Sequence, residues 1–215
     1  MQGLIVIVFL AAVIVASFSS IFFGHKRRQE LQELARKLGF MYCAERDHHI
    51  DDKYRFLNTL RVGSNRYAFN IMSGVYEGYD TMVFDYHYQT GSGKDTHHHF
   101  FSFFIMDIEK SFPELLITKE HLFSKIGQAL GFDDIDFESH EFSRKFCVRS
   151  KDKKFAYDFC NARMIEYLLA NCDLNIEVEQ NVLAVGFGRR LQAEEIEYNL
   201  NRMAQIRGLM PGYLF

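Results

Sequence analysis

The 215-residue chain is short of several residue types that mark particular kinds of protein, with two prolines, no tryptophan and four cysteines. Because proline is so rare and no Gly/Ser-rich or low-complexity tract occurs, the sequence shows no flexible linker. No two cysteines form a CxxC pair, so neither a zinc knuckle nor a redox motif is indicated. We expect Cys43, Cys147, Cys160 and Cys172 to be reduced, small hydrophobic residues of low reactivity.

An excess of positive charge is also missing, because 25 Lys and Arg residues stand against 28 Asp and Glu residues. This balance argues against nucleic acid as a partner. The sequence has neither a GxSxG nucleophile elbow nor an HExxH zinc motif. Its acidic stretch over residues 133–141 lacks the glycine and the ligand spacing of an EF-hand, so we interpret it as a solvated connection. No complete catalytic set is recognisable.

One long apolar run is present, over residues 3–24, and it carries no charged side chain. At about 1.5 Å of rise per residue, a helix of this length crosses the roughly 30 Å hydrocarbon core of a bilayer. The rival interpretation is a cleaved secretory signal, which has basic residues before a shorter apolar stretch. Here Met1 and Gln2 precede the run and the basic residues follow it, so the sequence predicts an uncleaved transmembrane anchor.

The basic cluster directly after the apolar run predicts the orientation of the chain. Lys26, Arg27 and Arg28 lie at the end of the expected span. Because Lys and Arg beside a span stay on the cytoplasmic side, we expect a single-pass protein of the inner membrane. Its N-terminus would lie outside and its main body in the cytoplasm.

The chain therefore divides into a transmembrane anchor over residues 1–24, a juxtamembrane basic amphipathic helix over residues 25–40 and a cytoplasmic α+β domain over residues 41–215. In the second region Leu31, Leu34, Ala35 and Leu38 recur at helical spacing, and Gly39 is a stop signal. The apolar stripe favours packing against the domain, as on other surface helices. The alternative is a helix that lies along anionic lipid headgroups.

Residues 61–108 change to the two-residue period of strands. Three strands are predicted at residues 67–72, 81–88 and 99–108, with turns at residues 74–80 and 90–96. In the middle strand an apolar set alternates with Val83, Asp85 and His87, which predicts one buried and one wetter face. Together these strands are expected to form an antiparallel meander.

The rest of the chain predicts a second group of helices and strands. A helix from Thr118 to Gly131 precedes a strand over residues 142–149 and a helix over residues 153–171 with an irregularity around Asn161. Residues 174–178 and 182–187 are expected to pair as a hairpin, and a last helix spans residues 193–208. Strands and helices come in blocks, so the fold class is α+β with a mainly antiparallel sheet and packed helices.

Three stretches resemble a known protein family: residues 83–94, residues 134–146 and the run from Phe155 onward. They are similar to a family of bacterial membrane-anchored proteins classed as domain of unknown function 3137. The resemblance implies a membrane-linked domain. It implies neither an activity nor a set of catalytic residues.

Residues 90–96 (TGSGKDT) are similar to a phosphate-binding loop but lack the residues that such a loop requires. Tyr88 stands where a Walker loop requires its first glycine, and Asp95 stands where Ser or Thr must follow the lysine. The residues that follow are strand-like, so no helix N-terminus is available to hold phosphate. We interpret this segment as a hairpin turn.

His97 and His99 are the most suggestive metal ligands, because alternate residues of a strand project to one face. Imidazoles bind Zn or another transition metal. A catalytic zinc usually takes three protein ligands, so His87 or Asp95 would have to join the same face. The competing interpretation is a solvated hairpin tip or a partly buried edge strand with no cofactor.

Two hypotheses on function follow. The first, which we prefer, is a non-enzymatic interaction or scaffolding domain held at the inner membrane, with a protein as its partner. The second is a membrane-tethered metal-dependent hydrolase that uses the cluster at His97 and His99. An exposed aromatic patch would favour the first, and a third ligand converging on the histidines would favour the second.

Overall fold

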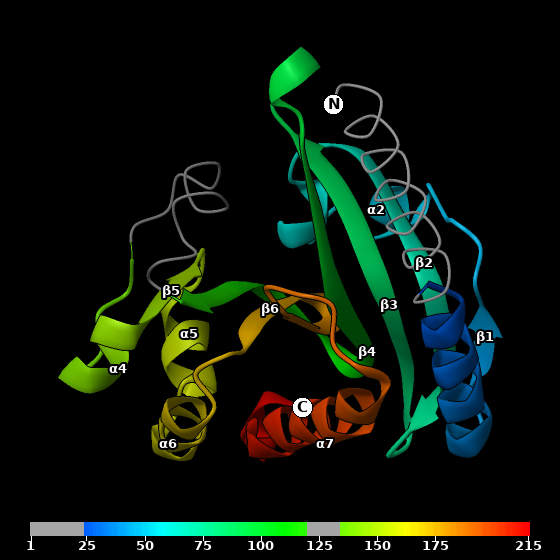
Figure 1. The fold of residues 1–215 in the computed structure, drawn as a ribbon. Coiled ribbons are helices and arrows are strands. Elements are labelled where there is room, and N and C mark those ends of the chain that lie inside the picture. The colour runs from blue at the N-terminus through cyan, green and yellow to red at the C-terminus, as the bar shows by residue number, and fades with distance from the viewer. Residues whose placement is uncertain (1–23, 120–133) are drawn as a thin grey trace, which may run out of the picture.

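The computed structural model describes residues 24–119 and 134–215, in which an antiparallel sheet is covered by helices (Figure 1). The strands are β1 (Met41–Cys43), β2 (Ser64–Tyr76), β3 (Tyr79–Thr90), β4 (His97–Lys119), β5 (Phe146–Ser150) and β6 (Asn175–Gly186). The helices are a helix over residues 24–38, α2 (Ile50–Lys53), α4 (His140–Lys145), α5 (Lys153–Phe159), α6 (Ala162–Ala170) and α7 (Ala193–Leu209). Short 3-10 turns are η1 (Thr59–Arg61), η2 (Gly93–Asp95) and η5 (Gly212–Leu214). The predicted mixed α+β class with an antiparallel sheet is confirmed.

The long strand β4 is the spine of the sheet, whose order is β1-β2-β3-β4-β5 with β6 also paired to β4. The first half of β4 pairs with β3 and the second half with β5, while β6 runs along the opposite edge. All of these pairings are antiparallel. The sheet therefore joins the predicted meander to the later strands without a break.

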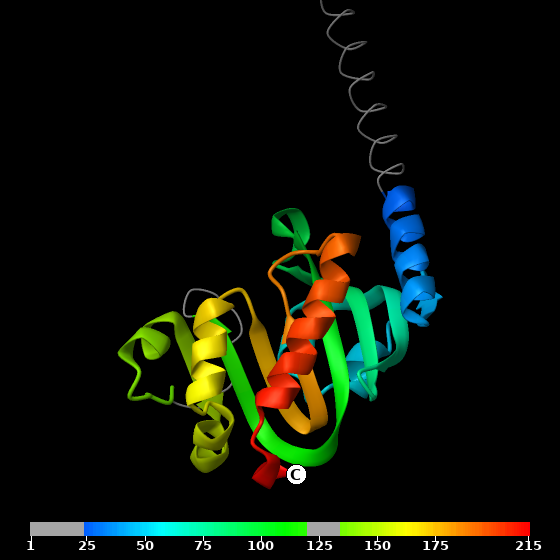
Figure 2. The same cartoon turned by 90° about the horizontal axis from the view of Figure 1, so that it is seen from below.

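Each face of the sheet has its own hydrophobic core. One core gathers side chains from the helix of residues 24–38, from α5 and α6 and from α7, which lies across β4 and β6 in Figure 2. The other is formed by α2 and the segment after it, which bring Tyr54, Leu57 and Leu60 against Phe84 and Phe103. Burial on both sides is consistent with the many apolar residues of β3 and β4.

Several predicted elements are confirmed. The strands at residues 67–72, 81–88 and 99–108 lie inside β2, β3 and β4, and α7 matches the last predicted helix. Asn161 divides the helix predicted over residues 153–171, because its side chain accepts the backbone N–H of Met164 and caps α6. In the helix of residues 24–38, Leu31 and Ala35 are buried in the core, so the amphipathic stripe packs on the sheet.

Two local predictions are wrong. The strand predicted over residues 142–149 begins only at Phe146, because Ser139 accepts the N–H of Phe142 and caps the helix α4 over residues 140–145. Residues 174–178 and 182–187 do not pair as a hairpin, because both halves belong to β6 and pair with β4. The register shifts between the halves because β4 has extra residues on both sides of Phe112, which pairs with Gln180 at a positive φ of 55°.

The predicted helix from Thr118 to Gly131 and the predicted anchor lie largely outside the described residues. Thr118 lies in β4 rather than at a helix start, and residues 120–131 of the helix expected after it lie outside the described residues. The predicted anchor also lies outside them except for Gly24. Within residues 24–119 and 134–215, every helix is too short or too polar to cross a bilayer.

Candidate interaction site

A buried ion pair joins the helix of residues 24–38 to the sheet. Arg27 donates from Nε to Asp85 Oδ2 at 3.0 Å and from Nη2 to Asp85 Oδ1 at 2.8 Å. The side chain of Arg27 is 13% exposed and that of Asp85 is 2% exposed. A bidentate pair of this kind has both geometric specificity and a charge-assisted hydrogen bond on each carboxylate oxygen.

The carboxylate of Asp85 also receives neutral donors from the neighbouring strands. Asn70 Nδ2 donates to Oδ2 at 2.9 Å, and Ser102 Oγ donates to Oδ1 at 3.0 Å. Arg27 Nη1 donates to the carbonyl of Leu191 at 2.6 Å, and the N–H of Leu191 donates to Ser102 Oγ at 2.9 Å. The network therefore ties the helix to β2, β3, β4 and the segment before α7.

This network corrects one expectation. Asp85 does not lie on a solvent-exposed face. Its buried carboxylate is satisfied by the Arg27 guanidinium and by the two neutral donors. Of the three basic residues, Arg27 pairs with Asp85, Arg28 is exposed, and Lys26 lies 3.5 Å from Glu30 on the helix surface. The orientation predicted from Lys26, Arg27 and Arg28 stays a prediction.

On the same face, a row of rings and guanidinium groups follows Asp85. Arg46 lies 4.5 Å from the ring centre of Tyr67, which stacks on His87 at 4.4 Å. The row continues from His87 to Phe100 at 4.7 Å, and Arg190 lies 5.3 Å from the ring centre of Phe100. Cation–π contacts thus hold two arginines at the ends of an aromatic row.

His87 is 1% exposed and has a defined hydrogen-bond geometry. Its Nδ1 lies 3.0 Å from the carbonyl oxygen of Asn65, which only accepts, so Nδ1 carries the proton in the neutral ring. Its Nε2 then accepts from Nδ1 of His98 at 2.9 Å. Burial lowers the pKa of His87, and the nearby His98 lowers it further.

The structure does not bring the four predicted metal ligands together. His87 pairs with His98, while His99 stacks on Tyr88 and contacts Thr90 Oγ1 from its Nε2 at 2.8 Å. In the β3–β4 register His97 faces Thr90 and His99 faces Tyr88, which places both on the face opposite His87. Asp95 lies in η2, within the predicted turn at the exposed hairpin tip.

Among residues 24–119 and 134–215, no three His, Cys, Asp or Glu side chains are placed to hold a metal ion. The expectation that His87 or Asp95 would converge on His97 and His99 therefore finds no support in the described geometry. Metal binding by these residues stays a prediction. The segment after Lys94 continues directly into β4, as expected of a hairpin rather than of a phosphate-binding loop.

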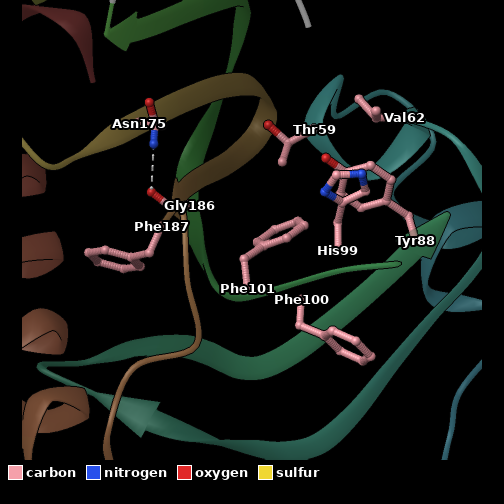
Figure 3. Close-up of a pocket in the computed structure, with 10 residues that line it drawn as sticks. Thr59, Val62, Tyr88, His99, Phe100, Phe101, Asn175, Gly186 and Phe187 are labelled. Carbon is pink, nitrogen blue, oxygen red and sulfur yellow. Dashed lines mark hydrogen bonds between the residues drawn. The ribbon is translucent and has the colours of Figure 1, made fainter. Parts of the chain in front are cut away.

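On the opposite face of the sheet, aromatic side chains surround a cavity of about 210 Å³. Figure 3 shows Tyr88, His99 and Phe101 on one side of it and Phe187 on the other. The cavity is lined by Thr59, Val62, Tyr88, His99, Phe100, Phe101, Asn175, Gly186, Phe187 and Gly188. An apolar space with a few polar groups at its edge is typical of a binding site.

A buried carboxylate positions the 3-10 turn at the rim of this aromatic cavity. Glu177 on β6 accepts the backbone N–H of Asn58 at 2.6 Å and that of Thr59 at 2.9 Å, and it also accepts the hydroxyl of Thr59. Desolvation by burial raises the pKa of Glu177, although these three donors oppose the shift. The hydrogen bonds hold η1, and with it Thr59, against the sheet.

A partly buried polar side chain lies at the edge of the aromatic cavity. Asn175 donates from Nδ2 to the carbonyl of Gly186 at 3.2 Å, as Figure 3 shows. Its Oδ1 is buried and has no hydrogen-bond partner among the described residues. The amide of Asn175 therefore ties the first residue of β6 to the last at the edge of the cavity.

The cysteines follow the expectation only in part. Burial raises the pKa of Cys147 to about 11 and raises that of Cys160 as well, which disfavours their reactive thiolates. Cys43, in contrast, is exposed on the edge strand β1, and Cys172 is partly exposed. No cysteine of the chain is disulfide-bonded in the structure.

Sequence reasoning did not find the aromatic cavity or the Arg27–Asp85 pair. The cavity combines residues from η1, β3, β4 and β6, which no spacing in the sequence connects. The ion pair joins residues 58 positions apart. The sequence shows an acidic residue inside an apolar strand and a basic residue inside an amphipathic helix. Neither pattern indicates that these two residues form a pair.

Comparison with known proteins gives one structural likeness. No family model matches the chain, and no curated protein matches it. The fold is similar to the crystal structure of the mycobacterial trehalose monomycolate transport factor A, with a TM-score of 0.65 and 14% sequence identity. The match covers 85% of this chain and 93% of that one. At this level of identity the likeness concerns the fold.

Proposed function

We propose that this chain is a non-enzymatic interaction module held at the inner membrane by residues 3–24. The observation that carries the proposal is the buried Arg27–Asp85 pair, three residues after the end of the apolar run. A flexible tether would leave the sheet free to reorient. The ion pair instead docks the juxtamembrane helix on the sheet, so the domain is held in one orientation next to the membrane.

The aromatic cavity is the proposed contact site for a protein partner. Its volume of about 210 Å³ is below the roughly 300–1,000 Å³ of typical small-molecule pockets. It is suited to one apolar anchor side chain, of the kind that contributes most of the binding energy at protein interfaces.

The remaining support comes from the structural neighbour and from the sequence. The neighbour is called a transport factor, and this name is compatible with an accessory role at a membrane. The basic residues after the apolar run support an outside N-terminus and a cytoplasmic domain. The resemblance to domain of unknown function 3137 supports membrane linkage. For the alternative, a metal-dependent hydrolase, the described residues provide no converging ligand set.

Blocking the cavity tests this proposal. Gly188 lines the cavity, its φ is not positive, and a Cβ there would meet no atom within 4 Å. Gly188→Trp therefore fills the space without a clash on the backbone. Gly208→Trp is the matched control, because Gly208 is also unobstructed and lies outside the cavity, in the last turn of α7. Both variants are made in the tagged full-length chain.

The measurement is affinity capture from native membranes, followed by quantitative mass spectrometry and metal analysis of the same sample. We expect a partner in stoichiometric amount with the unmodified chain and with Gly188→Trp a loss of about tenfold or more, the effect of losing one anchor residue. Gly208→Trp should retain the partner. Equal recovery from both variants would contradict the cavity as the contact site. A bound transition metal that disappears in a His97→Ala, His99→Ala variant would favour the hydrolase instead.

A further inference from the structure

A second cavity lies on the helix-bearing face, at the start of the juxtamembrane helix, and its volume is about 1,030 Å³. It is bounded by the first turns of the helix over residues 24–38, by Arg46 and by the segment that leads into α7. Figure 2 shows the first turns of these two helices next to each other, in blue and orange. We call this space the basic cavity, because its lining holds Lys26, Arg27, Arg28, Arg46 and Arg190.

The charges around the basic cavity do not cancel. Asp85 neutralises Arg27, and Glu30 lies 3.5 Å from Lys26. The other basic side chains are Arg28, Arg46 and Arg190, against one further carboxylate in the lining, Glu194. Within the described part of the chain none of these three arginines forms an ion pair, although all three are exposed.

Two of the three arginines are positioned before any ligand arrives. Arg46 lies over Tyr67 and Arg190 over Phe100, and the buried ring of His87 contacts both of these aromatic rings. An arginine held over a ring keeps its N–H donors in the guanidinium plane available to an anion. Less side-chain entropy is then lost when an anion binds.

We propose that the basic cavity binds the phosphate of an anionic phospholipid headgroup. Planar guanidinium groups match the oxygens of phosphate and donate two parallel hydrogen bonds to them. The lipid origin follows from place, because the cavity includes Gly24, the last residue of the apolar run. A residue at the end of a membrane span lies at the depth of the headgroups. This inference rests on the proposed membrane tether.

The test titrates purified full-length protein in a non-ionic detergent with two lipids that differ in headgroup charge. Phosphatidylglycerol is the anionic probe and phosphatidylcholine of the same acyl chains is the zwitterionic reference, and native mass spectrometry counts the bound lipid. We expect phosphatidylglycerol to bind about tenfold more tightly or better. The Arg28→Gln, Arg46→Gln, Arg190→Gln triple variant should bind both lipids equally.

Arg163→Gln is the matched control, because Arg163 is exposed on α6 and has no part in the basic cavity. It should keep the full preference. Each single Gln variant is also titrated, with far-UV circular dichroism as a check on folding, so a misfolded triple variant does not decide the result. An equal affinity of the native chain for both lipids would overturn the proposal. An unchanged preference for phosphatidylglycerol in the folded variants of Arg28, Arg46 and Arg190 would also overturn it.

Inorganic phosphate distinguishes the two sources of the same chemistry. If the lipid is the ligand, millimolar phosphate should displace little phosphatidylglycerol. Displacement at concentrations comparable to that of the lipid would assign the site to a free anion and overturn the headgroup assignment. Alkaline washing of native membranes is measured in parallel: release of the chain contradicts the proposed tether, whereas retention without a lipid preference contradicts only this inference.

Discussion

Removal of one partner of the Arg27–Asp85 pair should destabilise the fold strongly. Asp85 is 2% exposed and accepts four side-chain hydrogen bonds, two of them from Arg27. Breaking a buried pair costs about 3–5 kcal/mol, because the other charge is left without compensation. Arg27 is 13% exposed and retains the carbonyl of Leu191, so water can partly replace Asp85. We therefore expect Asp85→Ala to lower the free energy of unfolding by about 3 kcal/mol.

The double-mutant cycle separates the pair from its surroundings. Arg27→Ala should also cost about 3 kcal/mol, because Asp85 keeps only the donors of Asn70 and Ser102. The double variant should cost about 3–4 kcal/mol, well below the sum of the single variants. Urea unfolding of the full-length chain in detergent, followed by far-UV circular dichroism, measures each value. Both single variants should also raise the rate of amide hydrogen exchange in residues 24–38.

Glu141→Ala is the control, because Glu141 pairs with Lys145 on the exposed surface of α4. It should leave stability unchanged within error. Single-variant losses below about 1 kcal/mol that simply add would show that the Arg27–Asp85 pair behaves like a surface salt bridge. That result would refute the rigid docking of the helix over residues 24–38 on the sheet.

Acidification should destabilise the native chain more than it destabilises a His87→Phe variant. Burial lowers the pKa of His87 below the ordinary 6.5, so the unfolded chain binds more protons than the folded chain. The free energy of unfolding of the native chain should therefore fall as the pH drops below 6.5. Urea midpoints at pH about 7.5 and about 5.5 test this, and parallel changes in both proteins would contradict it. A membrane-impermeant maleimide should label exposed Cys43 only after cells are opened if the domain is cytoplasmic, while buried Cys147 and Cys160 stay unlabelled until denaturation, as mass spectrometry of the labelled peptides would show. Gly63→Ala should cost at least about 2 kcal/mol in urea unfolding, because the φ of Gly63 is +70° and the added Cβ would lie 2.2 Å from the carbonyl oxygen of Gln89; a stability equal to that of the native chain would refute this.

Local patterns in the sequence predicted many of the elements. The alternation in β3 and the capping residue Asn161 act between near neighbours, so the sequence alone indicates the strand and the helix boundary. The stripe at Leu31 and Ala35 correctly predicted which side of the first helix is buried. These features depend on periods and caps that are complete within a few residues.

Features that depend on distant partners were not predictable in this way. The alternation of residues in β3 predicted that Asp85 is solvent-exposed. Its burial is explained by the ion pair with Arg27, which lies on another element. The pattern of residues 174–187 predicted a hairpin because it does not show that both halves of β6 pair with β4, across a bulge of β4 at Phe112. The aromatic cavity and the basic cavity were missed for the same reason, since each gathers side chains from several separate segments.

The most direct test of the interaction module is photo-crosslinking from the aromatic cavity in living cells. Val62 lines the cavity and is replaced by benzoylphenylalanine, and Tyr198, which is 61% exposed on α7, is the control position. The account predicts a discrete protein adduct from position 62, lost with Gly188→Trp and absent from position 198. No protein adduct from position 62, or one unaffected by Gly188→Trp, would contradict it.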